Sequence, residues 1–101
     1  MIFEWDETKL RANVQKHGID FRDAEQVFPG PVITVLDSRQ EYGEDRYISL
    51  GRLADVVVVV VHTARSEKTR IISMRKAKLK ERQAYEEKIL FGFAAYSEPE
   101  G

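Results

Sequence analysis

Apolar side chains recur at helical spacing near the start of the chain and at strand spacing through its middle. Near the start, Leu10 and Val14 lie four residues apart, and Asp6 has the carboxylate that caps the first turn of a helix. Glycine is favoured directly after a helix, so Gly18 marks the end of this one. The pattern therefore predicts a helix over residues 7–17.

Two further helices are predicted. Asp20 has the side chain of a helix cap, and apolar residues follow at helical spacing over 21–28, until the Pro-Gly-Pro sequence at 29–31 stops the helix. Residues 76–90 have the composition of a helix, although their apolar stripe is blurred and no residue at the start is an obvious cap. Helices are thus expected near both ends of the chain.

A short apolar strand at residues 2–5 precedes the first helix, and four more strands follow the second helix in close succession. Polar residues between the first two of these four predict a loop over 37–45. Six consecutive valines predict that one strand lies at the centre of the sheet with both faces covered. The four strands are expected at 32–36, 46–50, 56–61 and 69–75.

Helices and strands are segregated along the chain, which is typical of the α+β class. We therefore expect an antiparallel β-sheet packed by two N-terminal helices and a C-terminal helix. The length of 101 residues suits a single domain, in which residues 97–101 form a frayed tail. The apolar segment 90–96 is expected to be buried against the sheet or in a partner.

Charge is unevenly distributed, although the formal net charge is only −1. Between residues 65 and 82 there are eight basic side chains and two acidic ones, a pattern that suits a phosphate-bearing partner and is also common on solvated surfaces. The sequence has no cysteine and no apolar stretch long enough to span a membrane. We therefore expect a cytoplasmic protein without disulfides, thiolate metal sites or membrane association.

Motifs for cofactors and metals are missing from the sequence. The six glycines form no phosphate-binding loop, and the two histidines, His17 and His62, stand in no metal-binding spacing. Neither a cofactor nor a metal site is predicted.

Basic side chains are expected to gather around one imidazole. His62 directly follows the valine strand, and a hairpin about residues 67–68 would bring residues 62–65 close to residues 70–73. In that arrangement His62 lies beside Arg70.

The neighbouring strands add further guanidinium groups to this region. Arg46 opens the preceding strand, and strict alternation places Ser73 and Arg75 on one face of the last strand and Arg70 on the other. Taken singly, each arginine is more often a surface or salt-bridged side chain. Gathered on neighbouring strands they repel one another unless something negative lies between them. We therefore predict one pocket for a negatively charged group, formed by His62, Arg46, Arg70 and Arg75.

These residues belong to longer segments that resemble a known family. The segments are FEWDETKLRANVQKHGIDFRDAEQVF at 3–28, DRYISLGR at 45–52, HTAR at 62–65 and RIISMRKAKLKERQAYEE at 70–87. The WD opening, the KxxxNxxKHG spacing and the RxISxRxA passage are specific in combination. Together they resemble the BrnT toxins of bacterial type II toxin-antitoxin systems.

The resemblance implies a RelE/ParE-like toxin fold and a ribonuclease activity that inhibits translation. It also implies a partner, a BrnA-like ribbon-helix-helix antitoxin that neutralises the toxin and through which the complex binds operator DNA. Two alternatives stay open: a binding module that uses its basic surface without chemistry, and a degenerate toxin that serves only as a co-repressor scaffold.

RNA cleavage without a metal can use the 2′-hydroxyl of the substrate as nucleophile. His62 is the expected acid or base, since its ordinary pKa suits proton transfer at neutral pH, and Arg46, Arg70 and Arg75 are expected to hold the scissile phosphate. Tyr85 is a further catalytic candidate, although a tyrosine on the inner stripe of a helix is more often part of the core. The residues expected to bind substrate are Arg65, Ser73, Lys9, Asn13, Lys16 and His17, and the last four share a helix face that reads either RNA or the antitoxin.

Overall fold

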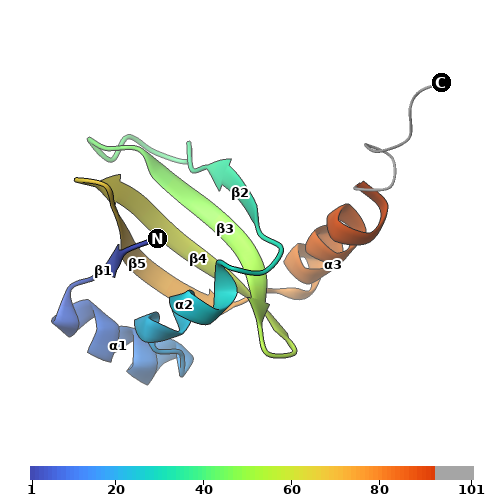
Figure 1. Ribbon diagram of the computed structural model, residues 1–101, viewed down its shortest axis with the longest axis horizontal. Helices are drawn as coiled ribbons and strands as arrows, with labels where there is room; N and C mark the ends of the chain where they lie inside the picture. The colour runs from blue at the N-terminus through green and yellow to red at the C-terminus, as the bar shows by residue number, and fades with distance from the viewer. Residues whose placement is uncertain (93–101) are drawn as a thin grey trace.

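The computed structural model describes residues 1–92, so the expected tail at 97–101 and most of the segment 90–96 lie outside the described residues. Helices α1 and α2 lie along one side of a twisted sheet, and α3 lies beyond its opposite end (Figure 1). Within residues 1–92, no helix is long and apolar enough to cross a membrane. The elements are β1 Phe3–Glu4, α1 Glu7–His17, the 3-10 turn η1 Phe21–Asp23, α2 Ala24–Val27, β2 Ile33–Leu36, β3 Arg46–Leu53, β4 Val56–Arg65, β5 Lys68–Lys76, α3 Leu79–Glu87 and the π-helical turn η2 Lys88–Gly92.

The α+β class is confirmed, but the prediction of a purely antiparallel sheet is wrong. The sheet has the order β1-β5-β4-β3-β2. β1 pairs with β5 in parallel, while the other pairs are antiparallel. After β1 the chain forms α1, which crosses one face of the sheet, and only then the remaining strands. β1 is therefore not joined to the next strand by a hairpin, and it lies in the sheet beside the last strand, β5.

The predicted ends of α1 agree with the structure. The carboxylate of Asp6 accepts a hydrogen bond from the backbone N–H of Lys9 at 3.1 Å. Gly18 has a φ of 74° and donates its backbone N–H to the carbonyl of Val14 at 2.8 Å. A residue with a Cβ would be strained in this left-handed conformation, so glycine terminates the helix at low cost.

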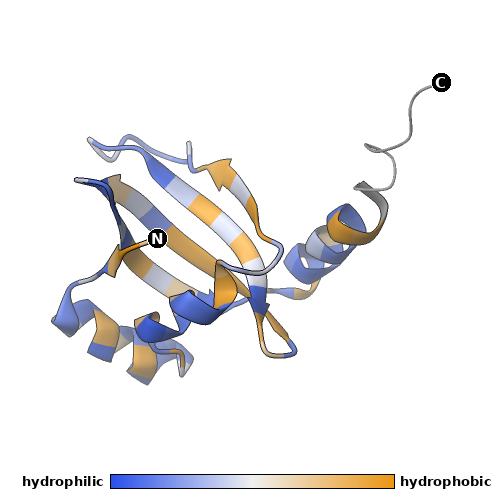
Figure 2. Ribbon diagram, in the orientation of Figure 1, coloured by the Kyte–Doolittle hydropathy of each residue, from blue (hydrophilic) through white to orange (hydrophobic). Residues whose placement is uncertain are grey.

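The valine strand, β4, lies at the centre of the sheet as expected. Val57, Val58, Val59 and Val60 are all buried. Figure 2 shows the apolar run along β4 beside the alternating polar and apolar residues of β3. Val58 and Val60 belong to the main core under the helices, while Val57 and Val59 are buried outside that core, on the other face.

The C-terminal helix begins later than predicted. β5 continues to Lys76, and the backbone N–H of Ala77 still donates to the carbonyl of Val57 at 2.9 Å. These hydrogen bonds to the central strand hold the backbone extended until Lys78, so α3 starts at Leu79 instead of residue 76.

A β-bulge in β5 overturns the strict alternation predicted for this strand. Ser73 pairs with Val61, but Ile71 pairs with His62, so Ile72 is an extra residue without a partner on β4. Ile71 and Met74 therefore both face the core, where they are 1% and 0% exposed. On the opposite face, the bulge brings Arg70 onto the same side as Ser73 and Arg75.

Asn13 fastens α1 to the outer edge of β5. Its side-chain amide donates to the carbonyls of Ile19 and Met74 at 2.9 and 2.8 Å, and its amide oxygen accepts the backbone N–H of Met74 at 3.2 Å. The amide thus replaces a neighbouring strand at Met74, and all three bonds are buried.

Asn13→Ala should lower the free energy of unfolding by about 3 kcal/mol, because it leaves the buried N–H and carbonyl of Met74 without partners. Urea unfolding followed by circular dichroism measures this decrease. Gln15→Ala, an exposed change on the same helix, should stay within about 0.5 kcal/mol of the parent chain. Equal stabilities of the two variants would show that the amide does not hold the edge of β5.

Candidate active site

The sheet has one face that α1 and α2 do not cover, which we call the open face. Strand register assigns residues to it, because directly paired residues of neighbouring strands share a face. Thr63 on β4 pairs with Arg46 on β3 and with Arg70 on β5. Arg46 and Arg70 therefore flank Thr63 on the open face, with Cα atoms two strand spacings, or roughly 10 Å, apart.

Arg65 joins these two residues near the end of the β4–β5 hairpin, and we call Arg46, Arg65 and Arg70 the guanidinium cluster. Glu44 contacts Nε of Arg46 at 3.4 Å and a terminal nitrogen of Arg65 at 3.3 Å, while Glu4 contacts Arg70 at 3.2 Å. Three positive groups thus share two carboxylates in direct contact. The contacts are long for charge-assisted hydrogen bonds, and Glu44 is divided between two partners.

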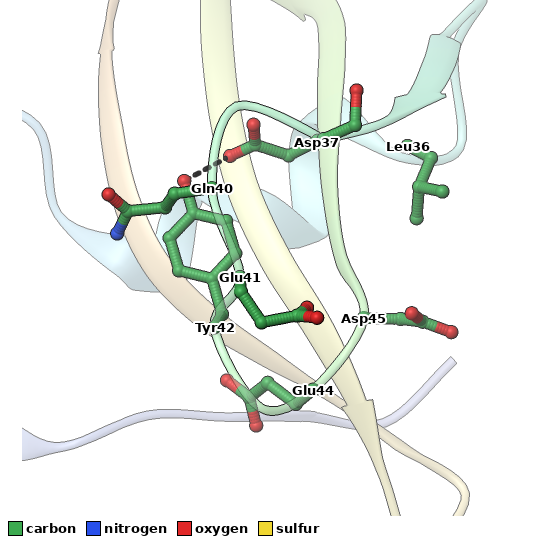
Figure 3. A pocket seen from close by; sticks show the side chains of 8 residues that line it. Leu36, Asp37, Gln40, Glu41, Tyr42, Glu44 and Asp45 are labelled. Atoms are coloured by element: carbon green, nitrogen blue, oxygen red, sulfur yellow. Dashed lines mark hydrogen bonds between the residues drawn. The ribbon is translucent and has the colours of Figure 1, made fainter.

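The loop 37–45 borders the cluster and fixes one of its members. The guanidinium carbon of Arg46 lies 4.2 Å from the centre of the Tyr42 ring, a cation–π contact. The Tyr42 hydroxyl donates to Asp37, as Figure 3 shows, and Asp37 also holds Arg39 through a fork of two 2.7 Å bonds. These bonds from Arg39 hold the pKa of Asp37 well below its usual range. The hollow beside the loop has a volume of about 340 Å³. Of the eight described residues that line it, four are acidic and none is basic, so it does not suit an anion.

Arg75 is on the open face but belongs to a different contact. Two of its nitrogens bind the two oxygens of Glu81 at 2.8 Å each. Glu81 also accepts the backbone N–H of Lys78 at 2.7 Å at the start of α3. Because Arg75 and this N–H both stabilise the carboxylate, the pKa of Glu81 falls to about 2. Arg75 is therefore the most firmly paired arginine of the predicted pocket and anchors α3 to the sheet.

The predicted grouping of His62 with the arginines is wrong. His62 pairs with Tyr47 and Ile71 and faces the helices, on the opposite side of the sheet from Arg70. Its ring meets Phe28 edge-on at 5.2 Å between centroids, and its Nε2 is hydrogen-bonded to Oγ of Ser49 at 2.7 Å. The side chain next in sequence, Thr63, is the one that points to the open face. β4 alternates without interruption, so His62 lies on the same side as Val58 and Val60, while Arg70, paired with Thr63, lies on the other side.

Tyr85 is part of a packed interior instead of an accessible surface. It is 1% exposed, and its hydroxyl donates to the carbonyl of Pro31 at 2.7 Å. This bond ties α3 to the segment before β2, so the tyrosine hydroxyl is already used within the fold.

The residues predicted to bind substrate fall into two places. Arg65 belongs to the guanidinium cluster. The remaining five line one shallow groove between α1 and β5; they are Lys9, Asn13, Lys16, His17 and Ser73.

Sequence reasoning missed the carboxylates that pair with the arginines. Glu4 is 66 residues from Arg70, and no local spacing marks such a contact. Tyr42 was likewise assigned only to a loop. Its ring reaches the guanidinium group of Arg46 only because the loop folds back on β3, and the sequence has no signal for that fold. Among residues 1–92, no three histidine, cysteine, aspartate or glutamate side chains gather closely enough to hold a metal ion.

The buried His62 should make stability depend on pH. Burial lowers its pKa below the ordinary 6.5, so just below pH 6.5 the unfolded chain binds a proton at His62 that the folded chain does not. This contribution to the free energy of unfolding is complete above that pH and decreases as pH falls through it. Urea unfolding at about pH 7.5 and about pH 5.5 measures the decrease.

In His62→Gln this part of the pH dependence should disappear, whereas His17→Gln, which changes a more exposed histidine, should keep it. Identical pH dependence in the parent chain and His62→Gln would contradict the assignment.

Comparison with known proteins identifies the family of the chain. No protein with a curated description matches the chain. The profile of one protein family, described as "Ribonuclease toxin, BrnT, of type II toxin-antitoxin system", matches residues 5–81. The match includes α1 with Asn13, the strands that carry the guanidinium cluster, and Glu81. It covers well over half of the chain, which therefore belongs to the BrnT family of ribonuclease toxins of type II toxin-antitoxin systems.

Proposed function

We propose that the protein is a metal-independent endoribonuclease that holds RNA on the open face of its sheet. The observation that carries the proposal is the guanidinium cluster, in which three arginines from β3, β4 and β5 share two carboxylates. Guanidinium groups stay charged and match two phosphate oxygens at once. The surrounding α+β arrangement supports a RelE/ParE-like toxin fold.

The spacing of the cluster suits one phosphate group. Arg46 and Arg70 stand on either side of Thr63, whose own side chain is 2% exposed and whose hydroxyl donates to the carbonyl of Asp45 at 2.6 Å. Thr63 therefore forms a floor that presents no free hydroxyl, and the two flanking arginines reach above it. A phosphate there would replace the long contacts to Glu4 and Glu44 with shorter, charge-assisted ones.

Cleavage on such a surface depends on electrostatic stabilisation more than on an imidazole. The 2′-hydroxyl of the RNA attacks the adjacent phosphorus and loses its proton, the bond to the 5′-oxygen breaks, and that oxygen takes a proton from water. Arginines offset the negative charge that develops on the phosphorane. Glu44 contacts Arg46 and Arg65, so it lies beside a phosphate held by them and can accept the 2′-hydroxyl proton. Arg65 and Arg46 lower the pKa of Glu44, and this pKa rises when the phosphate takes over the two arginines.

The same face explains how a partner would silence the protein. Membership of a type II toxin-antitoxin family implies an antitoxin partner. We propose a BrnA-like ribbon-helix-helix antitoxin that blocks access to the cluster in the cytoplasm and through which the complex reaches operator DNA. Free toxin then cleaves RNA and inhibits translation.

The test is cleavage of RNA by purified protein in the presence of a metal chelator. Arg46→Ala and Arg70→Ala should each reduce kcat/KM by about 10²-fold or more, with circular dichroism unchanged. Arg22→Ala is the matched control, because Arg22 also forms an ion pair, with Asp20 at 2.6 Å, but lies in η1 on the helix-covered side. His62→Gln should retain cleavage. Full activity of both cluster variants would contradict the proposed site.

A non-catalytic function remains the second candidate, since each arginine of the cluster already has a carboxylate partner, as on a purely structural surface. Protein that arrests growth on expression but does not cleave RNA would favour a binding module. Harmless expression without antitoxin would favour a co-repressor scaffold.

A further inference from the structure

A second group of cationic side chains lies between α1 and β5, which we call the α1–β5 groove. It is a shallow cavity of about 220 Å³, and its polar lining consists of Lys9, Asn13, Lys16, His17 and Ser73. Lys9 and Lys16 are both exposed, one at the start of α1 and the other near its end. The groove therefore offers positive charge at both ends.

The charges of the groove differ from those of the open face. Within residues 1–92, the arginines of the guanidinium cluster and Arg75 all form ion pairs, whereas neither Lys9 nor Lys16 forms one. Asp6 lies near the Lys9 end, but its carboxylate caps α1 through the backbone N–H of Lys9. Cations that contact no carboxylate within the fold are available to bind an external anion.

Ser73 connects the groove to the open face. It pairs with Val61, so it lies on the open face between Arg70 and Arg75, and it also lines the groove. The bulge at Ile72 produces this position, because it turns Arg70 to the same side as Ser73. An RNA strand bound at the guanidinium cluster can therefore continue past Ser73, across the edge of β5, toward α1. Within the described part of the chain, no carboxylate is among the side chains that line the groove.

The edge of β5 argues against a peptide as the occupant. A peptide that adds to a sheet edge needs free backbone N–H and carbonyl groups. At Met74 the side chain of Asn13 already occupies both. A docked helix needs a row of apolar pockets, but the apolar lining of the groove consists of Ala12 and Ile72. A phosphate backbone needs only cations and hydrogen-bond donors, which the groove supplies.

We propose that the α1–β5 groove binds backbone phosphates of the RNA beside the cleaved linkage, through Lys9 and Lys16, with Ser73 and His17 as hydrogen-bond donors. This inference rests on the proposed ribonuclease function and extends the substrate path beyond the open face. The groove binds substrate but does not take part in the bond-breaking step.

The experiment measures binding of a 2′-O-methyl RNA oligonucleotide, which lacks the nucleophilic hydroxyl and stays intact, by fluorescence anisotropy over a range of salt concentrations. The variant Lys9→Gln/Lys16→Gln should raise Kd and reduce the slope of log K against log salt by about 1.4, because each single-strand phosphate that a lysine neutralises adds about 0.7 to the slope. Arg11→Gln is the matched control, because it removes an exposed cation of the same helix outside the groove. Its slope should equal that of the parent chain.

Cleavage separates binding from chemistry. With a long RNA, the double lysine variant should show a raised KM and an unchanged kcat. With a dinucleoside monophosphate, whose single phosphate must sit at the cleavage site, the variant and the parent chain should have equal kcat/KM. Reduced kcat on both substrates would contradict a role limited to binding.

The outcomes distinguish this inference from the proposed function. If the parent chain does not cleave RNA, the proposed function fails, and if Arg46→Ala and Arg70→Ala both cleave RNA as well as the parent chain does, the proposed site on the open face fails. If Arg70→Ala loses cleavage while the double lysine variant keeps the parent slope and Kd, only the groove inference is overturned. If the double lysine variant binds RNA normally but loses affinity for the cognate antitoxin, the groove belongs to the protein partner.

Discussion

The pairing between β4 and β5 decides which side chains share a face of the sheet, and it depends on one extra residue. Ile72 interrupts the register between Val61 and His62, so the residues on either side of it are displaced by one position. Without the bulge, the alternation that puts Ile71 in the core would put Met74 on the open face. With it, both apolar side chains reach the core, and Arg70, Ser73 and Arg75 share the other face. His62 lies beneath Phe28 independently of the bulge, because β4 alternates regularly and places it on the same side as Val58 and Val60.

Much of the fold could be predicted because its signals are local. Asp6 and Gly18 mark the ends of α1 through hydrogen bonds to residues within four positions, and the valines of β4 are buried whichever face they occupy. The bulge has no such signal, since register depends on how two strands fit a shared core. The predicted pocket combined correct elements with an incorrect register on β5, which is why Arg70 shares the open face with Arg75. His62 lies on the other face because β4 alternates regularly from Val58 and Val60.

The carboxylates of the open face follow from the electrostatic cost of gathering cations on neighbouring strands. Arginines on the same face of neighbouring strands have Cα atoms roughly 5 to 10 Å apart, so their guanidinium groups can come close enough to repel one another. Glu4 and Glu44 reduce this repulsion from elements distant in sequence, with contacts of 3.2 to 3.4 Å. Glu81 is different, because its carboxylate accepts hydrogen bonds both from Arg75 and from the backbone N–H of Lys78 at the start of α3. In the proposed function a phosphate replaces the contacts of Glu4 and Glu44, whereas replacing Glu81 would also require the start of α3 to adjust.

Asn13 links the packing of α1 against β5 to the positions of the lysines in the α1–β5 groove. Its amide faces inward and completes the edge of β5 at Met74, which fixes both the distance and the rotation of α1 relative to that strand. Lys9 and Lys16 lie one helical turn before and about one turn after Asn13, so fixing Asn13 also fixes where their side chains leave the helix. The fold therefore fixes where these side chains leave the helix before any ligand binds, which would lower the entropic cost of the RNA binding proposed for the groove. This physical reason accounts for a lysine-asparagine-lysine spacing on one helix face: the central residue holds the strand edge, and the flanking residues present their charges beside it.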